Sequence, residues 1–407
     1  MKNNNCNNCK SKNLIHVFSL GRLSFSGRFG KNYKENIPKD SLNLVICNSC
    51  KLVQLDKYFN PKYLYGKGYG YRTGINKTMT DHVKKTVLAA LKFANVKSDD
   101  YVLDIASNDG TLLSFYPNSI QTVGIDPLIN KYKKYYKKIN YKISSFFQKN
   151  KILKLKLKKF KIITALSVFY DLRNPNEFLK DVKEILDEDG IFILEHADLY
   201  SIIKNNVFDT ICHEHLSYFS SKVIIDMVKK NNLRVFKHEF NEINGGSSRY
   251  YIAHNKSKYK TESSVSRILI LEKRNNIHKK ETLKIFFKKI LSISKQLSLL
   301  IKKIKQKKQS IHGYGASTKG NILLQFCGFG KKEIDFIADR NPLKFNLYTP
   351  GTKIKIISEK KSRKIGPNYY LVLPWHFKKE ILIREKKALK NKVKFIFPLP
   401  KSISSQK

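Results

Sequence analysis

The sequence has few features of a membrane or secreted protein. No apolar run approaches the roughly 18–20 residues that a membrane-spanning helix needs. The first residues, Met1 to Cys6, lack the apolar segment of a secretory signal. We therefore expect a cytoplasmic protein without a membrane partner. The 407 residues, of which 41% are hydrophobic and 12% aromatic, are enough for two or three domains with apolar cores.

Acidic residues and arginine are both scarce. The chain has 32 acidic and 79 basic residues, which gives a net charge of +47, and only 11 of the basic residues are arginine. Dense basic charge favours nucleic-acid binding through counterion release. Arginine, however, is the preferred residue for paired hydrogen bonds to phosphates and bases. Because lysine is spread over nearly every segment, a general enrichment in Lys, Asn and Ile explains the charge better, and we expect no specific nucleic-acid partner.

Cysteine is infrequent, but four of the six cysteines form two close pairs, Cys6-Asn-Asn-Cys9 and Cys47-Asn-Ser-Cys50. Without an export signal this pattern favours a metal over disulfides. Together the pairs offer the tetrahedral Cys₄ set of a structural zinc site, which leaves no coordination position for chemistry. The alternative is a redox pair with incidental thiols. The gap of about 37 residues exceeds the roughly 15–20 of zinc ribbons, so the intervening segment is a long loop or has structure of its own.

Beyond this module, apolar runs alternate with helical patterns, which is typical of βαβ units and a largely parallel sheet. Residues 272–308 predict one long amphipathic helix or two shorter ones, and a second α/β unit begins after Ser310. The expected strands of the first unit are Tyr101–Ala106, Thr122–Asp126, Phe160–Ser167, Ile191–His196, Arg234–Phe240 and Arg249–His254. Those of the second unit are Ser310–Tyr314, Glu333–Ala338, Tyr370–Leu373 and Val393–Phe397.

The turn after the first of these strands lacks the G-x-G-x-x-G pattern of dinucleotide-binding proteins. Instead, the segment Val102–Leu113 runs from a buried strand through small polar residues into a helix, and small residues let the backbone approach a ligand. Asp126 ends the next strand, 22 residues after Asp104, where an acid can accept hydrogen bonds from both ribose hydroxyls. This pair favours S-adenosylmethionine (SAM) over NAD. The alternative is a doubly wound fold with an incidental acid at a strand end.

Taken in order, the motifs of this chain resemble those of the nucleotide-diphospho-sugar C-methyltransferases, which methylate carbon 3 of keto-deoxysugars. The resemblance spans the chain from Cys6 to about Pro398. The motifs are Cys47–Gln54, the Tyr-Gly-Tyr-Arg-Thr-Gly run at 69–74, Leu103–Gly110, Asp209–Tyr218, Asn244–Ser247, Gly313–Gly320 and Tyr348–Gly351.

The resemblance implies an α/β protein of three parts: a small N-terminal zinc-binding module, a central Rossmann-like SAM methyltransferase domain and a C-terminal Rossmann-like α/β domain. The substrate would be a nucleotide-diphospho keto-sugar bound between the last two, and the protein a monomer or homodimer. We expect the module over residues 1–60 and the central domain with a Tyr-rich entry loop over 61–255. A helical connection would cover 256–308 and the C-terminal domain 309–400.

The site residues follow from the matched motifs. Methylation of a carbon next to a ketone needs a base for the α-proton and a donor for the enolate oxygen. His215 is the expected base, because imidazole titrates near neutral pH, and Glu214 and Tyr218 are the other expected catalytic residues. A metal pair or a structural role is the alternative for His213 and His215. The expected SAM-binding residues are Tyr71, Asp104, Ala106, Asn108, Asp109 and Asp126. The expected substrate-binding residues are Tyr170, His213, Asn244, Ser247, Gly315, Lys319 and Asp339, and the zinc ligands are Cys6, Cys9, Cys47 and Cys50.

Two positions depart from the family pattern. Ala106 stands where glycine is often found, a small change that the turn should tolerate. Cys212 stands where some members have a catalytic tyrosine, which leaves Tyr218 and Tyr170 as candidates for the hydroxyl and indicates a different sugar.

Two other functions stay open. A zinc-ribbon RNA-binding protein or RNA methyltransferase is favoured by the charge alone. In the other alternative, the C-terminal domain is a degenerate binding module without turnover.

Overall fold

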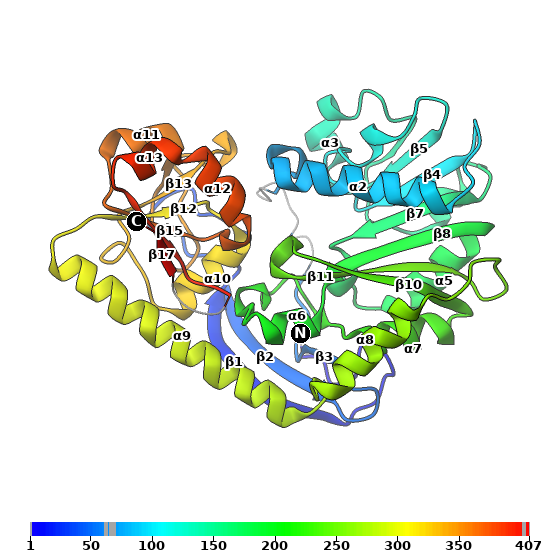
Figure 1. Cartoon of the computed structure of the whole chain (residues 1–407), viewed down its shortest axis with the longest axis horizontal. Helices are drawn as coiled ribbons and strands as arrows, with labels where there is room; N and C mark the ends of the chain where they lie inside the picture. The colour runs from blue at the N-terminus through cyan, green and yellow to red at the C-terminus, as the bar shows by residue number, and fades with distance from the viewer. Residues whose placement is uncertain (1, 61–63, 65–70, 401–403, 407) are drawn as a thin grey trace.

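The computed structural model describes residues 2–60, 64, 71–400 and 404–406, which form three β-sheets with surrounding helices (Figure 1). Most of the expected Tyr-rich entry loop lies outside the described residues. Within them, no helix is both long and apolar enough to cross a membrane.

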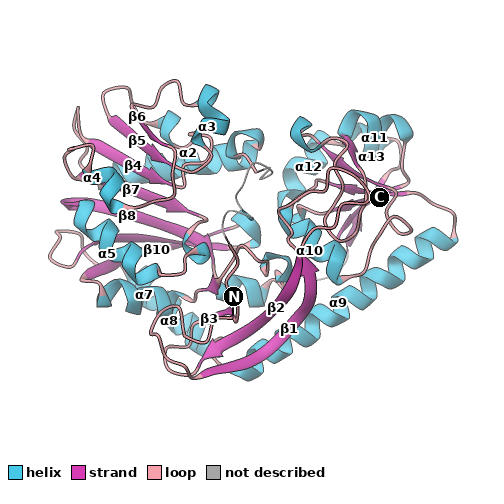
Figure 2. Ribbon diagram, turned by 180° about the vertical axis from the view of Figure 1, so that it is seen from behind, coloured by secondary structure: helices cyan, strands magenta, loops and turns pink. Residues whose placement is uncertain are grey.

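The N-terminal sheet is antiparallel and contains a long hairpin. Its strands, in order, are β1 (Leu14–Ser24), β2 (Lys39–Cys47), β3 (Val53–Leu55) and β9 (Ser217–Tyr218). Strands β1 and β2 run from the zinc module to the C-terminal sheet (Figure 2). There, the side-chain amide of Gln325 accepts a hydrogen bond from Ser24 N at 2.6 Å and donates one to Ser24 O at 3.2 Å. The segment between the cysteine pairs therefore has structure of its own, which joins the two ends of the molecule.

The central sheet is built as expected from βαβ units, with an antiparallel pair at one edge. Most positions of its middle strands are buried and most of these are apolar, as in sheets covered on both faces. The strand order is β10 (Leu233–Asn241), β11 (Ser247–His254), β8 (Leu186–Ala197), β7 (Phe160–Leu166), β4 (Tyr101–Ile105), β5 (Gln121–Ile125) and β6 (Tyr141–Ile143). Its main helices are α2 (Lys77–Phe93), α5 (Pro175–Ile185), α6 (Leu199–Lys204) and α7 (Ser221–Lys230).

The C-terminal sheet has five parallel strands and one antiparallel edge strand. The order is β14 (Ile356–Ser358), β13 (Phe336–Asp339), β12 (Ile311–Tyr314), β15 (Tyr369–Val372), β16 (Lys394–Phe397) and β17 (Ser404–Gln406). The helices are α10 (Thr318–Phe326), α11 (Glu359–Ile365), α12 (Lys378–Arg384) and α13 (Lys386–Lys390). All expected strands are found with shifted ends, the largest shift being that of β8, which begins at Leu186 instead of Ile191. Strands β6, β14, β17 and those of the N-terminal sheet were not predicted.

The connection between the two α/β units consists of two helices, α8 (Ser263–Arg274) and α9 (Lys280–Gln306). Helix α9 runs along the outside of the molecule beside β1 and β2 (Figure 1). Its apolar face packs on the hairpin, where the rings of Phe18 and Phe287 stack with centroids 4.6 Å apart. One apolar core thus includes residues of β1, α9 and the C-terminal sheet.

Candidate active site

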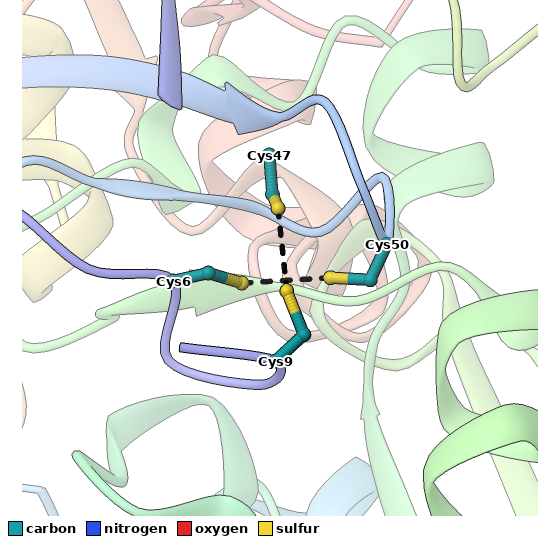
Figure 3. Close-up of side chains that lie close together, drawn as sticks. All are labelled: Cys6, Cys9, Cys47 and Cys50. Atoms are coloured by element: carbon teal, nitrogen blue, oxygen red, sulfur yellow. Dashed lines mark hydrogen bonds between the residues drawn. The ribbon is translucent and has the colours of Figure 1, made fainter. Parts of the chain in front are cut away.

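The four paired cysteines meet at one point of the N-terminal module (Figure 3). Their sulfur atoms all lie within 4.8 Å of one another, and two pairs, Cys6–Cys50 and Cys9–Cys47, are 3.5 Å apart. A tetrahedral zinc ion with Zn–S bonds of about 2.3 Å requires sulfurs about 3.8 Å apart. The donor set therefore fits a structural zinc ion, as the spacing predicted.

The zinc module also supports the segment that carries His215. Strand β3 pairs with β9, which begins two residues after His215. Between them, Leu216 donates its N–H to Tyr170 O at 2.8 Å and accepts a hydrogen bond from Leu55 N at 2.9 Å. The position of His215 thus depends on the integrity of the zinc module.

A single cavity of about 560 Å³ lies between the central and C-terminal sheets. Its lining comes from the carboxyl ends of strands in both sheets, from the segment Tyr71–Asn76, from the His215 loop and from Gly27 and Phe29 of the N-terminal module. Ligands of open parallel sheets bind at these strand ends. Two ligands bound at the two sheets would therefore share one cavity.

The central-domain wall of the cavity contains the turn that the sequence assigned to SAM. Ala106 adopts a φ of +61°, a left-handed conformation that explains why glycine is common there. Asp104, also in the wall, accepts a hydrogen bond from the Thr164 hydroxyl at 2.6 Å. Burial raises the pKa of Asp104 to about 7.

Asp126 directly follows β5 and closes this turn. Its carboxylate accepts hydrogen bonds from Asn108 N at 3.0 Å and Leu128 N at 2.6 Å, and burial raises its pKa to about 6. Each carboxylate oxygen keeps a second lone pair for a ligand hydroxyl. Tyr71 and Asn108 line the cavity beside it. Asp109 does not. Its carboxylate turns away from the cavity and accepts from Gly74 N at 3.0 Å and from the Thr111 hydroxyl at 2.6 Å, which is a structural role.

The C-terminal wall repeats this arrangement after β12. Gly315 has a φ of +84°, and a Cβ there would lie 2.7 Å from the Pro374 ring, so only glycine fits. Asp339, at the end of β13, accepts hydrogen bonds from Ala316 N and Asn341 N, both at 2.7 Å. Lys319, in the first turn of α10, lines the cavity and donates to Asn244 O at 2.6 Å.

His215 lies in the cavity between the two walls. Its Nδ1 donates to Thr210 O at 2.7 Å, so the lone pair of the neutral ring is on Nε2. Among the described residues Nε2 has no hydrogen-bond partner, and the Tyr170 ring packs against the imidazole with centroids 4.1 Å apart. Burial, and then the positive charge of Lys319, lower the pKa of His215 to about 3, which keeps the imidazole neutral.

Glu214 lines the cavity, but its carboxylate is turned towards the N-terminal module. It accepts hydrogen bonds from Gly27 N at 3.1 Å and from the Ser26 hydroxyl at 3.3 Å, and burial raises its pKa. No hydrogen bond to the His215 ring is found among the described residues. The structure therefore gives Glu214 a role in joining the His215 loop to the N-terminal module.

Three other expected site residues do not line the cavity. His213 packs between Phe25 and Phe59, with ring centroids 4.8 and 4.9 Å away. Tyr218 is buried in β9, and the Ser247 hydroxyl donates to Ile243 O at 3.0 Å. The three residues are buried, and residues 212–214 form a turn rather than a strand. Of the candidates for the missing hydroxyl at Cys212, only Tyr170 is in the cavity wall.

The cavity wall also contains residues that the sequence motifs did not single out. Glu195, at the end of β8, is buried and bonded to His82 Nε2 at 2.6 Å and to Arg249 Nε at 2.7 Å. His376 follows β15 in the segment Pro374–Phe377. Both follow or end strands of the predicted sheets, and that position at a carboxyl end was the available signal.

Comparisons with known proteins identify three parts of the chain. Residues 6–65 match a family model described as a zinc binding domain, residues 76–238 a methyltransferase domain and residues 242–400 a C-methyltransferase C-terminal domain. The chain is 28% identical over 400 residues to the C-methyltransferase NovU of Streptomyces niveus, which covers 97% of this chain and 95% of NovU. The three-part organisation and the cofactors SAM and zinc are thereby confirmed.

Solved structures are similar to less than half of the chain. A SAM-dependent methyltransferase of Clostridium acetobutylicum is 12% identical with a TM-score of 0.34, and the match covers 43% of this chain and 92% of that one. The magnesium protoporphyrin IX methyltransferase of Synechocystis is 13% identical with a TM-score of 0.33, with 44% and 88% covered.

Proposed function

We propose that this SAM-dependent C-methyltransferase methylates carbon 3 of a nucleotide-linked 4-keto-deoxyhexose. The main support is the composition of the cavity. It contains two strand-to-helix turns, one closed by Asp126 and the other by Asp339. His215 lies between them, and its Nε2 has no hydrogen-bond partner among the described residues. The class of sugar and the position of methylation are inferred from the sequence resemblance. The methylated product would serve the assembly of a surface polysaccharide or a glycoside.

His215 is the residue suited to remove the α-proton next to the ketone. Its Nδ1–H is held by Thr210 O, so Nε2 carries the lone pair in the cavity, with no competing partner among the described residues. The base takes the proton, the C–H electron pair becomes the carbon–carbon double bond, and the carbonyl electrons move to the oxygen. Tyr170, packed on the imidazole, restricts the ring to this orientation.

The residues for the methyl donor are those around the β4 turn: Tyr71, Asp104, Ala106, Asn108 and Asp126. When bound, SAM supplies the methyl group that the substrate carbon takes up, and the electron pair of the broken S–C bond stays on sulfur. Asp126 has free lone pairs for the ribose hydroxyls. The small side chain of Ala106 lets the ligand approach the backbone.

The nucleotide diphosphate would bind at the start of α10, with Lys319 as the cation and Asp339 at the ribose. A helix N-terminus with small residues favours phosphate, and Gly315, Ala316, Ser317 and Thr318 all line the cavity there. Asn244 would stay beside Lys319 through the hydrogen bond to its carbonyl oxygen. This placement puts the sugar towards His215.

Binding of a diphosphate would also make His215 a stronger base. Burial lowers the pKa of His215 first, and the charge of Lys319 lowers it further. An anion next to Lys319 offsets that charge, because opposite charges favour each other's ionised form. We therefore propose that deprotonation is favoured only when the anionic substrate is in place.

The domain limits of the sequence analysis, namely 1–60, 61–255, 256–308 and 309–400, stay part of this proposal. The hydrogen bonds between Gln325 and Ser24, and between β3 and β9, join the N-terminal unit to the other two.

The direct test is incubation of the protein with methyl-labelled SAM and a panel of nucleotide-linked keto-deoxysugars. We expect one of them to gain the label, and NMR of the product to place the new methyl on carbon 3. A methyl on another carbon would contradict only the position. Label in RNA but in no sugar would contradict the proposal and favour the RNA methyltransferase that the net charge of +47 suggests.

A further inference from the structure

His376 stands on a turn that joins the C-terminal domain to the His215 segment. Its neighbour Trp375 donates its indole N–H to Asp209 at 2.8 Å. Asp209 belongs to the same short helix as Thr210, the partner of His215. On the other side, a Cβ at Gly245 would lie 2.6 Å from the Trp375 ring, so the turn after Asn244 packs directly on the indole. The backbone of His376 is therefore fixed at the boundary of the two domains.

The His376 ring lines the cavity, yet it makes no hydrogen bond to the described residues. Its Nδ1 is buried without a partner, so Nε2 is the nitrogen left for the cavity. A buried N–H without a partner is rare because it is costly, whereas an unmet acceptor is tolerated more often. The favoured tautomer therefore carries its hydrogen on Nε2, as a donor towards the cavity.

The two cavity imidazoles are thus complementary. His215 presents a lone pair, because its hydrogen is held by Thr210 O, and His376 presents an N–H. Lys319 is close enough to affect both rings. Burial, and then its positive charge, lower the pKa of His376 well below the usual value. The positive charge of Lys319 and the neutral N–H of His376 would both stabilise an oxygen that becomes negative, because neither group loses its proton.

We propose that His376 is a second catalytic residue, which donates an Nε2–H hydrogen bond to the ketone oxygen of the substrate while His215 removes the α-proton. This rests on the proposed function. As the C–H electron pair moves into the carbon–carbon bond, the oxygen gains the carbonyl electrons and the hydrogen bond strengthens. His376 keeps its hydrogen throughout, and the proton taken from carbon stays on His215 until it passes to solvent.

Three other donors of the cavity wall, Tyr170, Lys319 and Cys212, are less suited to this oxygen. Tyr170 packs on the His215 ring and so lies on the side of the base. Lys319 is the cation proposed for the diphosphate, and it also donates to Asn244 O at 2.6 Å. Burial raises the pKa of Cys212 well above its usual value, which leaves a neutral thiol, a weak donor.

The test compares His376→Leu, which has no donor, with His376→Asn, which keeps an amide N–H. For each we measure kcat, SAM affinity by calorimetry, and exchange of the substrate α-proton with deuterated solvent. We expect His376→Leu to lower both kcat and the exchange rate by about 10²-fold or more, with unchanged SAM affinity. His376→Asn should retain at least tenfold more of both. If His376→Leu stays within about threefold of the wild type in both rates, the inference is wrong.

A second measurement applies if His376→Leu does not fold. The infrared carbonyl frequency of a ¹³C-labelled keto-sugar nucleotide bound to the wild type should fall relative to solution, and fall less in His376→Asn. If the carbonyl frequency of the keto-sugar bound to the wild type equals its frequency in solution, the inference is wrong. Failure of the proposed function is distinguishable, because then the wild type itself methylates none of the keto-sugars.

Discussion

Asp126 and Asp339 make the same pair of backbone hydrogen bonds in the two α/β domains. Each carboxylate accepts one N–H from the turn after the preceding strand, Asn108 or Ala316, and one from the residue two positions later, Leu128 or Asn341. Each lies at the carboxyl end of the second strand of its unit, Asp126 just after β5 and Asp339 as the last residue of β13, and each lines the common cavity. Two turns of the same construction, each closed by an aspartate, thus face one cavity.

The two acids should therefore affect different ligands. Asp126→Ala should weaken SAM binding by about 1–3 kcal/mol, the loss expected for hydrogen bonds to a charged acceptor, and leave nucleotide-sugar binding nearly unchanged. Asp339→Ala should do the reverse. Calorimetry with each ligand and each variant checks the pattern. Unchanged SAM affinity in Asp126→Ala would mean that the cofactor lies elsewhere.

Removal of the zinc should reduce turnover more than SAM binding. Cys47→Ser removes one of the four thiolates, and loss of the module releases β3 from β9 and the His215 loop. We expect metal analysis to fall from about one zinc per chain to nearly none, with a lower melting temperature. Cys327→Ser is the control, because Cys327 lies apart and contacts Ser294. A zinc-free Cys47→Ser protein with full turnover would contradict the link.

Ala106→Gly should stabilise the protein slightly. A left-handed φ of +61° is strained for alanine, by about 1–2 kcal/mol, and glycine removes this strain while it adds about 0.5–1 kcal/mol of unfolded-state entropy. The net gain in unfolding free energy should reach about 1 kcal/mol by chemical denaturation. Ala165→Gly, at a buried position of β7, is the control and should destabilise. A large loss of stability in Ala106→Gly would mean that the turn is not strained.

Asp104 should make the ligand-free protein less stable as the pH rises. Its pKa is about 7 in the folded protein against an ordinary 3.8, because of burial. The folded state therefore binds more protons than the unfolded state between these values, and the stability from Asp104 is lost as the pH rises through about 7. The variant Asp104→Asn has no carboxyl group at this position and should not lose this stability as the pH rises. Its stability relative to wild type should rise by a few kcal/mol between pH 4 and 8, because each unit of difference in pKa corresponds to about 1.4 kcal/mol. A difference independent of pH would show that Asp104 ionises normally.

The sequence predicted those parts of the site that depend on short local patterns. The spacing of Cys6, Cys9, Cys47 and Cys50 gave the metal ligands, and the alternation of strands and helices gave two parallel sheets. Asp126 could be placed because strand ends of a parallel sheet share one edge.

The remaining parts depend on tertiary contacts. The direction of the Tyr218 side chain is set by the pairing of β9 with β3, from a segment more than 150 residues earlier. His213 is held by packing against Phe25 and Phe59, which are similarly distant in the sequence. The extent of β1 and β2 follows from their packing on α9 and Gln325. His376 carries no motif of its own, and its place in the cavity follows from the contacts of Trp375 with Asp209 and Gly245.

The most direct test of the account is exchange of the substrate α-proton in deuterated buffer, with an unreactive SAM analogue bound. We predict that the wild type exchanges this proton and that His215→Asn, with SAM and sugar-nucleotide affinities retained, does so about 10²–10⁴ times more slowly and loses turnover to a similar extent. If His215→Asn turns over and exchanges like the wild type, the base lies elsewhere and the account of the cavity is wrong. If turnover falls while exchange is unchanged, His215 positions the substrate and the assignment of the base is contradicted.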